Sequence, residues 1–149
     1  MKKIETQVVI ESDISTVWNL LTDFEKHPDW NPFITSIQGE KAAGKFLSVS
    51  IKPPEGKGMT FKPVVLKFEP NKEFRWKGKL GIQGIFDGEH YFILEEVDNN
   101  QTKFIHGEKF SGILVYLMGN VLEKTKIGFE LMNEALKKQS ESLKTASVT

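Results

Sequence analysis

Residues 102–112, TKFIHGEKFSG, combine the alternation of a β-strand with side chains that can do chemistry. One face of this strand carries, at every second residue, Phe104, His106, Glu108 and Phe110. A half-buried strand usually turns its apolar residues inward and its charged residues toward water. A histidine and a carboxylate on the apolar face are therefore candidates for proton transfer or for orienting a bound molecule.

The preceding segment repeats the pattern. One face of residues 86–94 carries Phe86, Gly88, His90, Phe92 and Leu94. A loop of three or five residues around 98–100, with Asn99 or Asn100 in the left-handed conformation, would place both sets on the same sheet face. In that register His90 faces Glu108, with Cβ atoms about 4.5–5.5 Å apart. The other predicted pairs are Gly88 with Phe110, Phe92 with His106, and Leu94 with Phe104.

Two interpretations of the pair between His90 and Glu108 remain open. In the first, the face is a pocket wall, where aromatic side chains supply apolar area and His90, His106 and Glu108 orient a ligand. In the second, the histidine and the carboxylate satisfy each other inside a packed core. A metal site from the same residues is less favoured, because diagonal neighbours on adjacent strands lie about 7–8 Å apart. We therefore expect no metal and no cofactor.

Several large apolar side chains elsewhere are candidate ligand contacts, with ordinary core packing as the alternative for each. The loop HPDWNPF (27–33) either gates a cavity or fixes the first helices to the sheet, and its His27 is expected on the surface. Gly128 lies inside a predicted helix, where glycine costs about 1 kcal/mol relative to alanine, and this indicates a close approach by another element. These further candidates are Trp30, Phe33, Trp76, Phe129 and Met132.

The elements that position these residues follow from periodicity. Alternation predicts a first strand over 3–11, and Ser12 with Asp13 offers an N-cap for a short amphipathic helix over 13–22. Residues 24–33 indicate a short helix or turn followed by a loop. Apolar residues at three- and four-residue spacing predict a long amphipathic helix over 120–143. The remaining strands are predicted at 34–39, 45–52, 60–69, 72–79, 86–97 and 101–111.

This order predicts an α+β domain. Sequential strands joined by short turns indicate an antiparallel meander, and the long helix is the obvious cover for its apolar face. We expect one domain over residues 1–144, followed by a frayed tail at 145–149.

Composition bounds the possible partners. The 149 residues include 20 basic and 20 acidic side chains without a basic block, which argues against a nucleic-acid surface. Cysteine is absent, so disulfides and thiol chemistry are excluded for this sequence. No apolar run approaches the roughly 20 residues of a membrane helix, so stable membrane insertion is not expected. We expect a soluble, cytoplasmic protein, and charge balance leaves its oligomeric state open.

Four segments, DFEKHPDWNPFI, FDGEHYFILEE, TKFIHGEKFSG and GFELMNEALKKQSE, resemble the SRPBCC superfamily of START and birch-pollen-allergen-like proteins. The resemblance covers nearly the whole chain and is strongest to the polyketide cyclase/dehydrase and lipid-transport branch. It implies a helix-grip fold, in which a curved, here seven-stranded, antiparallel sheet wraps around a long C-terminal helix and two short helices follow the first strand. It also implies a cavity between sheet and helix. Members bind lipids, sterols, polyketides or plant hormones, some catalyse cyclisation, and no universal catalytic motif accompanies the fold.

Three functions are consistent with the sequence. The favoured one is binding of a small hydrophobic molecule, such as a lipid or polyketide, which needs only a cavity and an orienting polar group. The second is a cyclase or dehydratase that uses Glu108, with a raised pKa, and His90 as acid and base. Strand parity points the single arginine, Arg75, outward, away from any substrate carbonyl. The third is a co-chaperone-like interaction module that uses an apolar patch at 113–118.

Overall fold

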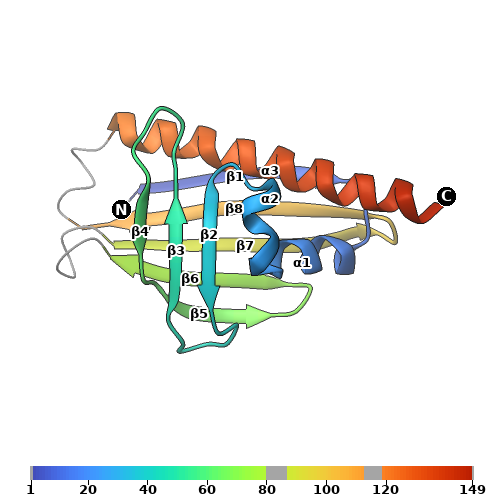
Figure 1. Ribbon diagram of the computed structural model, residues 1–149, viewed down its shortest axis with the longest axis horizontal. Coiled ribbons are helices and arrows are strands. Elements are labelled where there is room, and N and C mark those ends of the chain that lie inside the picture. The colour runs from blue at the N-terminus through green and yellow to red at the C-terminus, as the bar shows by residue number, and fades with distance from the viewer. Residues whose placement is uncertain (1, 80–86, 113–118, 149) are drawn as a thin grey trace.

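The computed structural model describes residues 2–79, 87–112 and 119–148, whose helices and strands are drawn in Figure 1. They confirm the α+β class and the helix-grip arrangement. The long C-terminal helix continues to Val148, whereas the sequence placed its end near residue 143. In chain order the elements are β1 Lys2–Ile10, α1 Ile14–Thr22, the 3-10 turn η1 Phe24–Lys26, α2 His27–Trp30, β2 Ile34–Gly39, β3 Leu47–Ile51, β4 Met59–Phe61, β5 Val64–Glu69, β6 Glu73–Lys79, β7 Asp87–Asp98, β8 Gln101–Ser111 and α3 Gly119–Val148.

The described strands form two antiparallel sheets rather than the single seven-stranded sheet that we predicted. The larger sheet has the order β1-β8-β7-β6-β5 and the smaller one the order β2-β3-β4. The strand predicted at 60–69 is divided into β4 and β5 around Pro63, which has no N–H group to donate to a ladder. An isolated bridge between Phe46 and Val64 links the two sheets.

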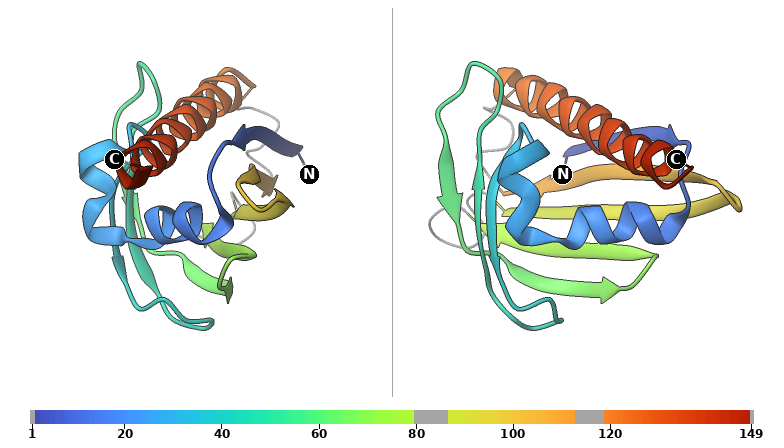
Figure 2. Two further views of the ribbon diagram at one scale, coloured as in Figure 1. Left: turned by 90° about the vertical axis from the view of Figure 1, so that its right-hand side faces the viewer. Right: turned by 45° about the vertical axis from the view of Figure 1, so that its right-hand side comes forward.

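The two sheets and α3 enclose the interior. The small sheet runs across the direction of the long strands, and α3 lies along these strands beside β1 (Figures 1 and 2). Near its C-terminal end, α3 is hydrogen-bonded to β1 and to Glu11, the residue that follows β1. The ammonium group of Lys137 donates to the Val9 carbonyl at 3.0 Å, and the Glu141 carboxylate accepts from the Glu11 N–H at 2.9 Å.

The hairpin of β7 and β8 has the predicted register. His90 is paired with Glu108, and the pairs of Gly88 with Phe110, Phe92 with His106 and Leu94 with Phe104 are also present. The predicted loop of three or five residues is wrong, because Asp98 pairs with Gln101 and only two residues connect them. A bulge between Glu96 and Asp98 adds Val97 to one strand. A two-residue turn alone would place His90 and Glu108 on opposite faces of the sheet, and the extra residue returns them to the same face.

The two asparagines of this turn also differ from expectation. Neither has a positive φ, and the non-glycine residues with one in the described chain are Glu55 and Asn71. The turn is closed instead by the carboxylate of Asp98, which accepts a hydrogen bond of 2.9 Å from the N–H of Asn100. A side chain that accepts from the backbone two residues on is a common way to stabilise such a turn.

The segment 27–33 fixes the first helices to the sheet. His27 is buried rather than on the surface, and its Nε2 donates to the Leu21 carbonyl at 2.6 Å. The unprotonated Nδ1 then accepts from the Asn31 amide at 3.1 Å. The amide oxygen of Asn31 accepts from the N–H groups of Phe33 and Ile34, each at 2.9 Å. This network sets the position of Phe33 at the start of β2.

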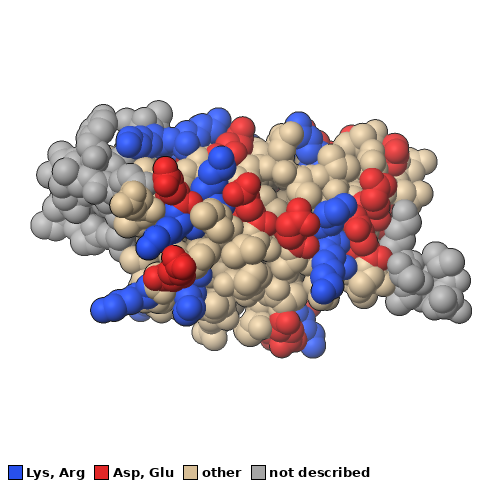
Figure 3. Space-filling model, turned by 90° about the horizontal axis from the view of Figure 1, so that it is seen from above, with Lys and Arg blue, Asp and Glu red and all other residues tan. Residues whose placement is uncertain are grey.

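Charge is mixed over the face drawn in Figure 3. Lys and Arg side chains lie among Asp and Glu side chains there, and neither sign covers the face alone. Among the helices that the structure describes, none is both long enough and apolar enough to cross a bilayer.

Candidate ligand pocket

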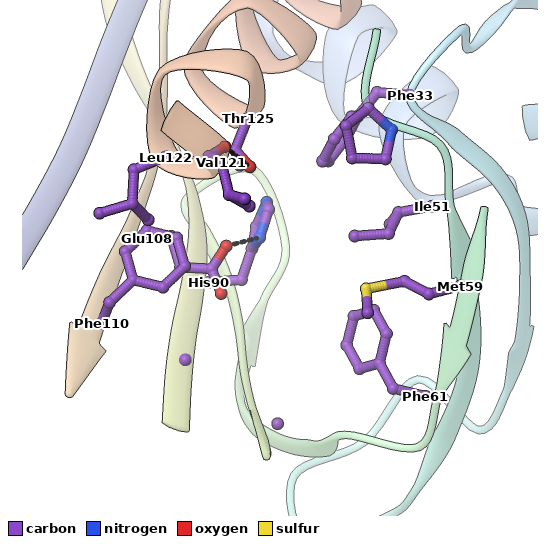
Figure 4. A pocket seen from close by; sticks show the side chains of 13 residues that line it. Phe33, Ile51, Met59, Phe61, His90, Glu108, Phe110, Val121, Leu122 and Thr125 are labelled. Atoms are coloured by element: carbon purple, nitrogen blue, oxygen red, sulfur yellow. Dashed lines mark hydrogen bonds and ion pairs between the residues drawn. The ribbon is translucent and has the colours of Figure 1, made fainter. Parts of the chain in front are cut away.

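A pocket of about 120 Å³ lies where the two sheets meet the first turns of α3 (Figure 4). The small sheet and the loops beside it form one wall, on which Figure 4 shows Phe33, Ile51, Met59 and Phe61. The large sheet and α3 form the opposite wall. Among the described residues, those that line the pocket are Phe33, Ile51, Pro53, Met59, Phe61, Gly78, Gly88, His90, Glu108, Phe110, Val121, Leu122 and Thr125.

Two glycines on neighbouring strands form part of the pocket wall. Gly78 of β6 is paired with Gly88 of β7, which in turn is paired with Phe110 of β8. A Cβ atom on Gly88 would collide with the Glu108 carboxylate, and one on Gly78 would lie 3.1 Å from the ring of Phe61. Two adjacent positions of the wall therefore carry no side chain of their own, and the side chains of Glu108 and Phe61 pack against them.

The polar part of the wall is a carboxyl–imidazole pair. Oε1 of Glu108 lies 3.1 Å from Nδ1 of His90, and these side chains are 17% and 4% exposed. Thr125 also lines the pocket, but its hydroxyl donates to the Val121 carbonyl at 2.7 Å within α3. Among the described lining residues, His90 and Glu108 are therefore the ionisable ones.

A chain of hydrogen bonds continues from this pair into the core. Nε2 of His90 lies 2.7 Å from Nε2 of His106, and Nδ1 of His106 lies 2.9 Å from Oδ1 of Asn133 on α3. The amide group of Asn133 donates to Oγ1 of Thr6 at 2.8 Å, and that hydroxyl donates to the His106 carbonyl at 2.9 Å. The pocket carboxyl is thus connected through two buried imidazoles to β1 and α3.

Burial governs the ionisation of this chain. It raises the pKa of Glu108 to about 8 and lowers the pKa of His90 to about 3. The pKa of His106 is well below its ordinary value, first because of burial and then because His90 is close. The rings around the imidazoles account for the lack of solvent. Trp76 stacks on His90 with ring centroids 4.8 Å apart, and Phe129 stacks on His106 at 4.1 Å.

The structure brings four of the predicted site residues to the pocket, namely Phe33, His90, Glu108 and Phe110. Five others, Trp76, Phe92, His106, Phe129 and Met132, are buried deeper because their side chains fill the interior under α3. Trp30 packs beside His27 with ring centroids 5.0 Å apart and does not line the pocket either. Phe86 and residues 113–118 lie outside the described residues, so a role for them stays a prediction. Contact with a ligand also stays a prediction for the four lining residues.

Two other expectations can be followed in the structure. The close approach at Gly128 is made by Phe33, whose ring atom Cδ1 would lie 2.6 Å from an added Cβ. Arg75 points away from the pocket, as strand parity predicted, and its guanidinium contacts Glu73 and Glu89 at 2.7 Å each. The Arg75 guanidinium also lies over the ring of Tyr91, at 4.7 Å from its centroid.

Metal binding finds no support in this geometry. His90 and His106 contact each other directly through their Nε2 atoms, while Glu108 lies on the other side of the His90 ring. A common point for an ion would need all three groups to converge. Within the described residues, no group of three or more His, Asp or Glu side chains is arranged to hold a metal ion.

Sequence reasoning missed one wall of the pocket and the end of the hydrogen-bonded chain. Asn133 and Thr6 had a signal, because each is a polar residue on an otherwise apolar face of its element. Gly78 and Gly88 also had one, since glycine inside a strand often marks a close approach. The residues of the small sheet and of the start of α3 had none, because their position depends on how the two sheets fold over each other. These are Ile51, Met59, Phe61 and Val121.

Comparison with known proteins gives a family and a fold. The sequence pattern of the family described as polyketide cyclase / dehydrase and lipid transport matches residues 1–146. No curated protein is significantly similar to the chain in sequence.

Three solved structures of related fold have low sequence identity to this chain. A START superfamily protein from Mycobacterium smegmatis has a TM-score of 0.75 and 19% identity, over 95% of this chain and 98% of its own. The Zhui aromatase/cyclase from Streptomyces sp. R1128 has a TM-score of 0.75 and 13% identity, over 94% and 93%. The protein XoxI from Bacillus cereus has a TM-score of 0.70 and 17% identity, over 97% and 99%. At these identities the similarity shows a shared fold.

Proposed function

The chain belongs to the polyketide cyclase/dehydrase and lipid-transport family, and we propose that it binds a small, uncharged hydrophobic molecule in the pocket described above. The observation that carries this proposal is a largely apolar pocket whose described wall carries the ionisable pair of Glu108 and His90. Ligand sites commonly combine an apolar lining with a few placed polar groups.

The size of the pocket limits what enters it. Its volume is about 120 Å³, close to that of apolar cavities of about 150 Å³ that bind a benzene ring. Val121 and Met59 at its wall are 47% and 39% exposed, so the pocket communicates with solvent. We infer that one ring or a short alkyl chain enters, while a larger ligand would leave its remainder outside.

The charge of the wall favours an uncharged ligand. No Lys or Arg side chain is among the described lining residues, so an entering carboxylate or phosphate would lose its hydration without gaining a cation. Glu108 and His90 share one proton between the pKa values of about 3 and about 8, and the pair then has no net charge that would attract an ion.

A matched pair of substitutions on α3 tests this proposal. Val121 and Ile127 are 47% and 49% exposed, but only Val121 lines the pocket. We expect propylbenzene to bind the wild-type protein at one site in a calorimetric or NMR titration. Val121→Trp should weaken this binding at least tenfold by filling the pocket, and Ile127→Trp should change it less than twofold. Equal effects of the two substitutions would contradict the proposal.

An acid–base enzyme of the cyclase or dehydratase type is the second candidate. The observation that favours it is the carboxyl group of Glu108, which burial keeps protonated near neutral pH, beside a histidine at 3.1 Å. The position of Arg75, held by Glu73 and Glu89 on the outer face, is against it. Turnover of a poly-β-ketone thioester by the wild-type protein, and its loss in Glu108→Gln, would support the enzyme. Unchanged turnover in that variant would exclude Glu108 from the mechanism.

A further inference from the structure

The hydrogen-bonded chain behind the pocket has a fixed direction, which begins at a carbonyl group. The carbonyl of His106 can only accept, so the hydroxyl of Thr6 donates to it at 2.9 Å. The oxygen of Thr6 then accepts from the amide N–H of Asn133 at 2.8 Å. The amide oxygen of Asn133 consequently faces His106. Nδ1 of His106 carries a hydrogen and donates it to this oxygen at 2.9 Å.

This direction continues through both imidazoles to the pocket. His106 is neutral because it is fully buried, so its Nε2 is an acceptor and the Nε2–H of His90 donates to it at 2.7 Å. Nδ1 of His90 is then an acceptor that faces Oε1 of Glu108 at 3.1 Å. The pair therefore has its proton on the line between Nδ1 and Oε1, whether the carboxyl donates it or the imidazole holds it.

The other carboxyl oxygen of Glu108 is left as an acceptor in both forms. Oε2 has no hydrogen-bond partner among the described residues, and the side chain is 17% exposed toward the pocket. It lies against Gly88, in the space that a Cβ atom on that residue would occupy. Thr125 behaves in the same way, because its hydroxyl hydrogen is used by the Val121 carbonyl and only the oxygen can take a further bond.

The polar side chains that line the described wall thus offer acceptors and no donor. We propose that the pocket selects an uncharged hydrophobic molecule with a hydroxyl or N–H group at its inner end, which donates to Oε2 of Glu108. This inference rests on the proposed function and narrows it to alcohols, phenols and similar donors. A ligand whose inner end carries only a ketone, ether or carboxylate oxygen would place acceptor against acceptor.

Three probes with one apolar body test the inference at pH 6. The probes are 4-propylphenol, its methyl ether and the 4-propylbenzoate anion, and their affinities are measured by calorimetric titration of the full chain. We expect the wild-type protein to bind the phenol roughly three- to tenfold more tightly than the ether, the usual effect of one added neutral hydrogen bond. The benzoate anion should bind most weakly. Equal affinities for phenol and ether would overturn the inference and leave the proposed function intact, whereas no binding of any probe would overturn both.

Two substitutions of Glu108 separate the effect of its hydrogen-bond acceptor from the effect of its side-chain shape. In Glu108→Gln the amide N–H can donate to Nδ1 of His90, which leaves the amide oxygen to accept, so the preference for the phenol should persist. In Glu108→Met the acceptor is lost, and phenol and ether should bind with affinities within twofold of each other. A Glu108→Gln variant that prefers the ether would contradict the direction that we assign to the chain. If Glu108→Met does not fold, as judged by circular dichroism, the wild-type protein and Glu108→Gln still decide the question.

Discussion

The space between the large sheet and α3 consists of two regions that are built from the same elements and differ in packing. In the deep region Phe104, Phe129 and Leu136 are each 0% exposed, and the aromatic rings fill the interior. At the other region, which is the pocket, β7 and α3 contribute Gly88 and Val121 instead. One strand pair and one helix thus form a filled core along part of their length and a cavity along the rest.

The difference shows what the pocket costs and where its boundary lies. A cavity gives up the contacts that a filled core would make, and this loss lowers the free energy of unfolding. The hydrogen-bonded chain of His90, His106 and Asn133 lies at the boundary between the two regions. This chain ends at the pocket wall, where Nδ1 of His90 contacts the carboxyl group of Glu108 at 3.1 Å. We interpret the deep region as the part that stabilises the fold and the pocket as the part that can bind a ligand.

The largest expected effect comes from emptying the filled region. Phe129→Ala should lower the free energy of unfolding by about 3–5 kcal/mol, because the buried ring of Phe129 packs against Phe33, His90 and His106. Phe110→Ala, on the pocket wall, should cost less than Phe129→Ala, since part of its surface already faces a cavity. Urea unfolding monitored by circular dichroism measures both values. A cost for Phe110→Ala equal to that for Phe129→Ala would remove the distinction between the regions.

The next effect concerns the pH dependence of stability. The folded-state pKa of Glu108 is about 8 against an ordinary value of 4.5, so the folded protein holds this proton more tightly than the unfolded chain. The contribution of Glu108 to the free energy of unfolding should therefore fall as the pH rises from about 4.5 to about 8. His90 acts in the opposite sense, because its folded-state pKa is about 3 against 6.5, and it destabilises the fold as the pH falls through that range. The contribution of the pair should be most favourable between pH 4.5 and 6.5.

The substitution Glu108→Gln removes the part of the pH dependence of stability that comes from the titration of Glu108. In the described structure the ionisable groups near Glu108 are His90 on β7 and His106 behind it, and the pocket-lining residues of α3 are uncharged. The loss of stability between pH 5 and 8, on the order of a few kcal/mol, should therefore be smaller in the variant than in the wild-type protein. Urea unfolding at several pH values gives the two profiles. Parallel profiles would mean that the carboxyl of Glu108 is ionised and solvated in the folded protein.

A smaller effect is expected when the cavity alone is narrowed. Gly88→Ala adds a methyl group where the Glu108 carboxylate lies, so it should displace that side chain into the pocket and weaken the binding of propylbenzene about tenfold. Gly58→Ala is the matched control, because its added Cβ meets only the Ile51 carbonyl at 3.6 Å and the residue does not line the pocket. Calorimetric titration of both variants measures the difference. Unaltered binding in Gly88→Ala would place the ligand elsewhere.

Much of the fold could be predicted because periodicity reports which residues share a face. The alternation in 86–94 and 102–112 was enough to pair His90 with Glu108 correctly. The bulge at Val97 could not be predicted, since it depends on which of two turns fits the twist of the strands. Likewise, the division at Pro63 has a clear sequence signal, but the way in which the small sheet folds over the large one has none.

The candidate site was predictable only on the sheet side for similar reasons. Strand parity identifies inward-facing residues, so Phe110 and Glu108 were found, but it cannot tell a filled interior from a hollow one. That distinction depends on the sizes of side chains brought together from distant segments. Phe129 fills the space above His106, whereas Val121, two turns earlier on the same helix, leaves space beside Phe110.

Native mass spectrometry of the purified protein tests the central claim most directly. The wild-type protein should carry an additional mass that leaves on denaturation, or should take up one equivalent of 4-propylphenol, and Val121→Trp should do neither. This result would mean that the pocket is a binding site. A bare mass for the wild-type protein, with no uptake of 4-propylphenol or propylbenzene, would contradict the account and make the pair of Glu108 and His90 a structural feature of the core.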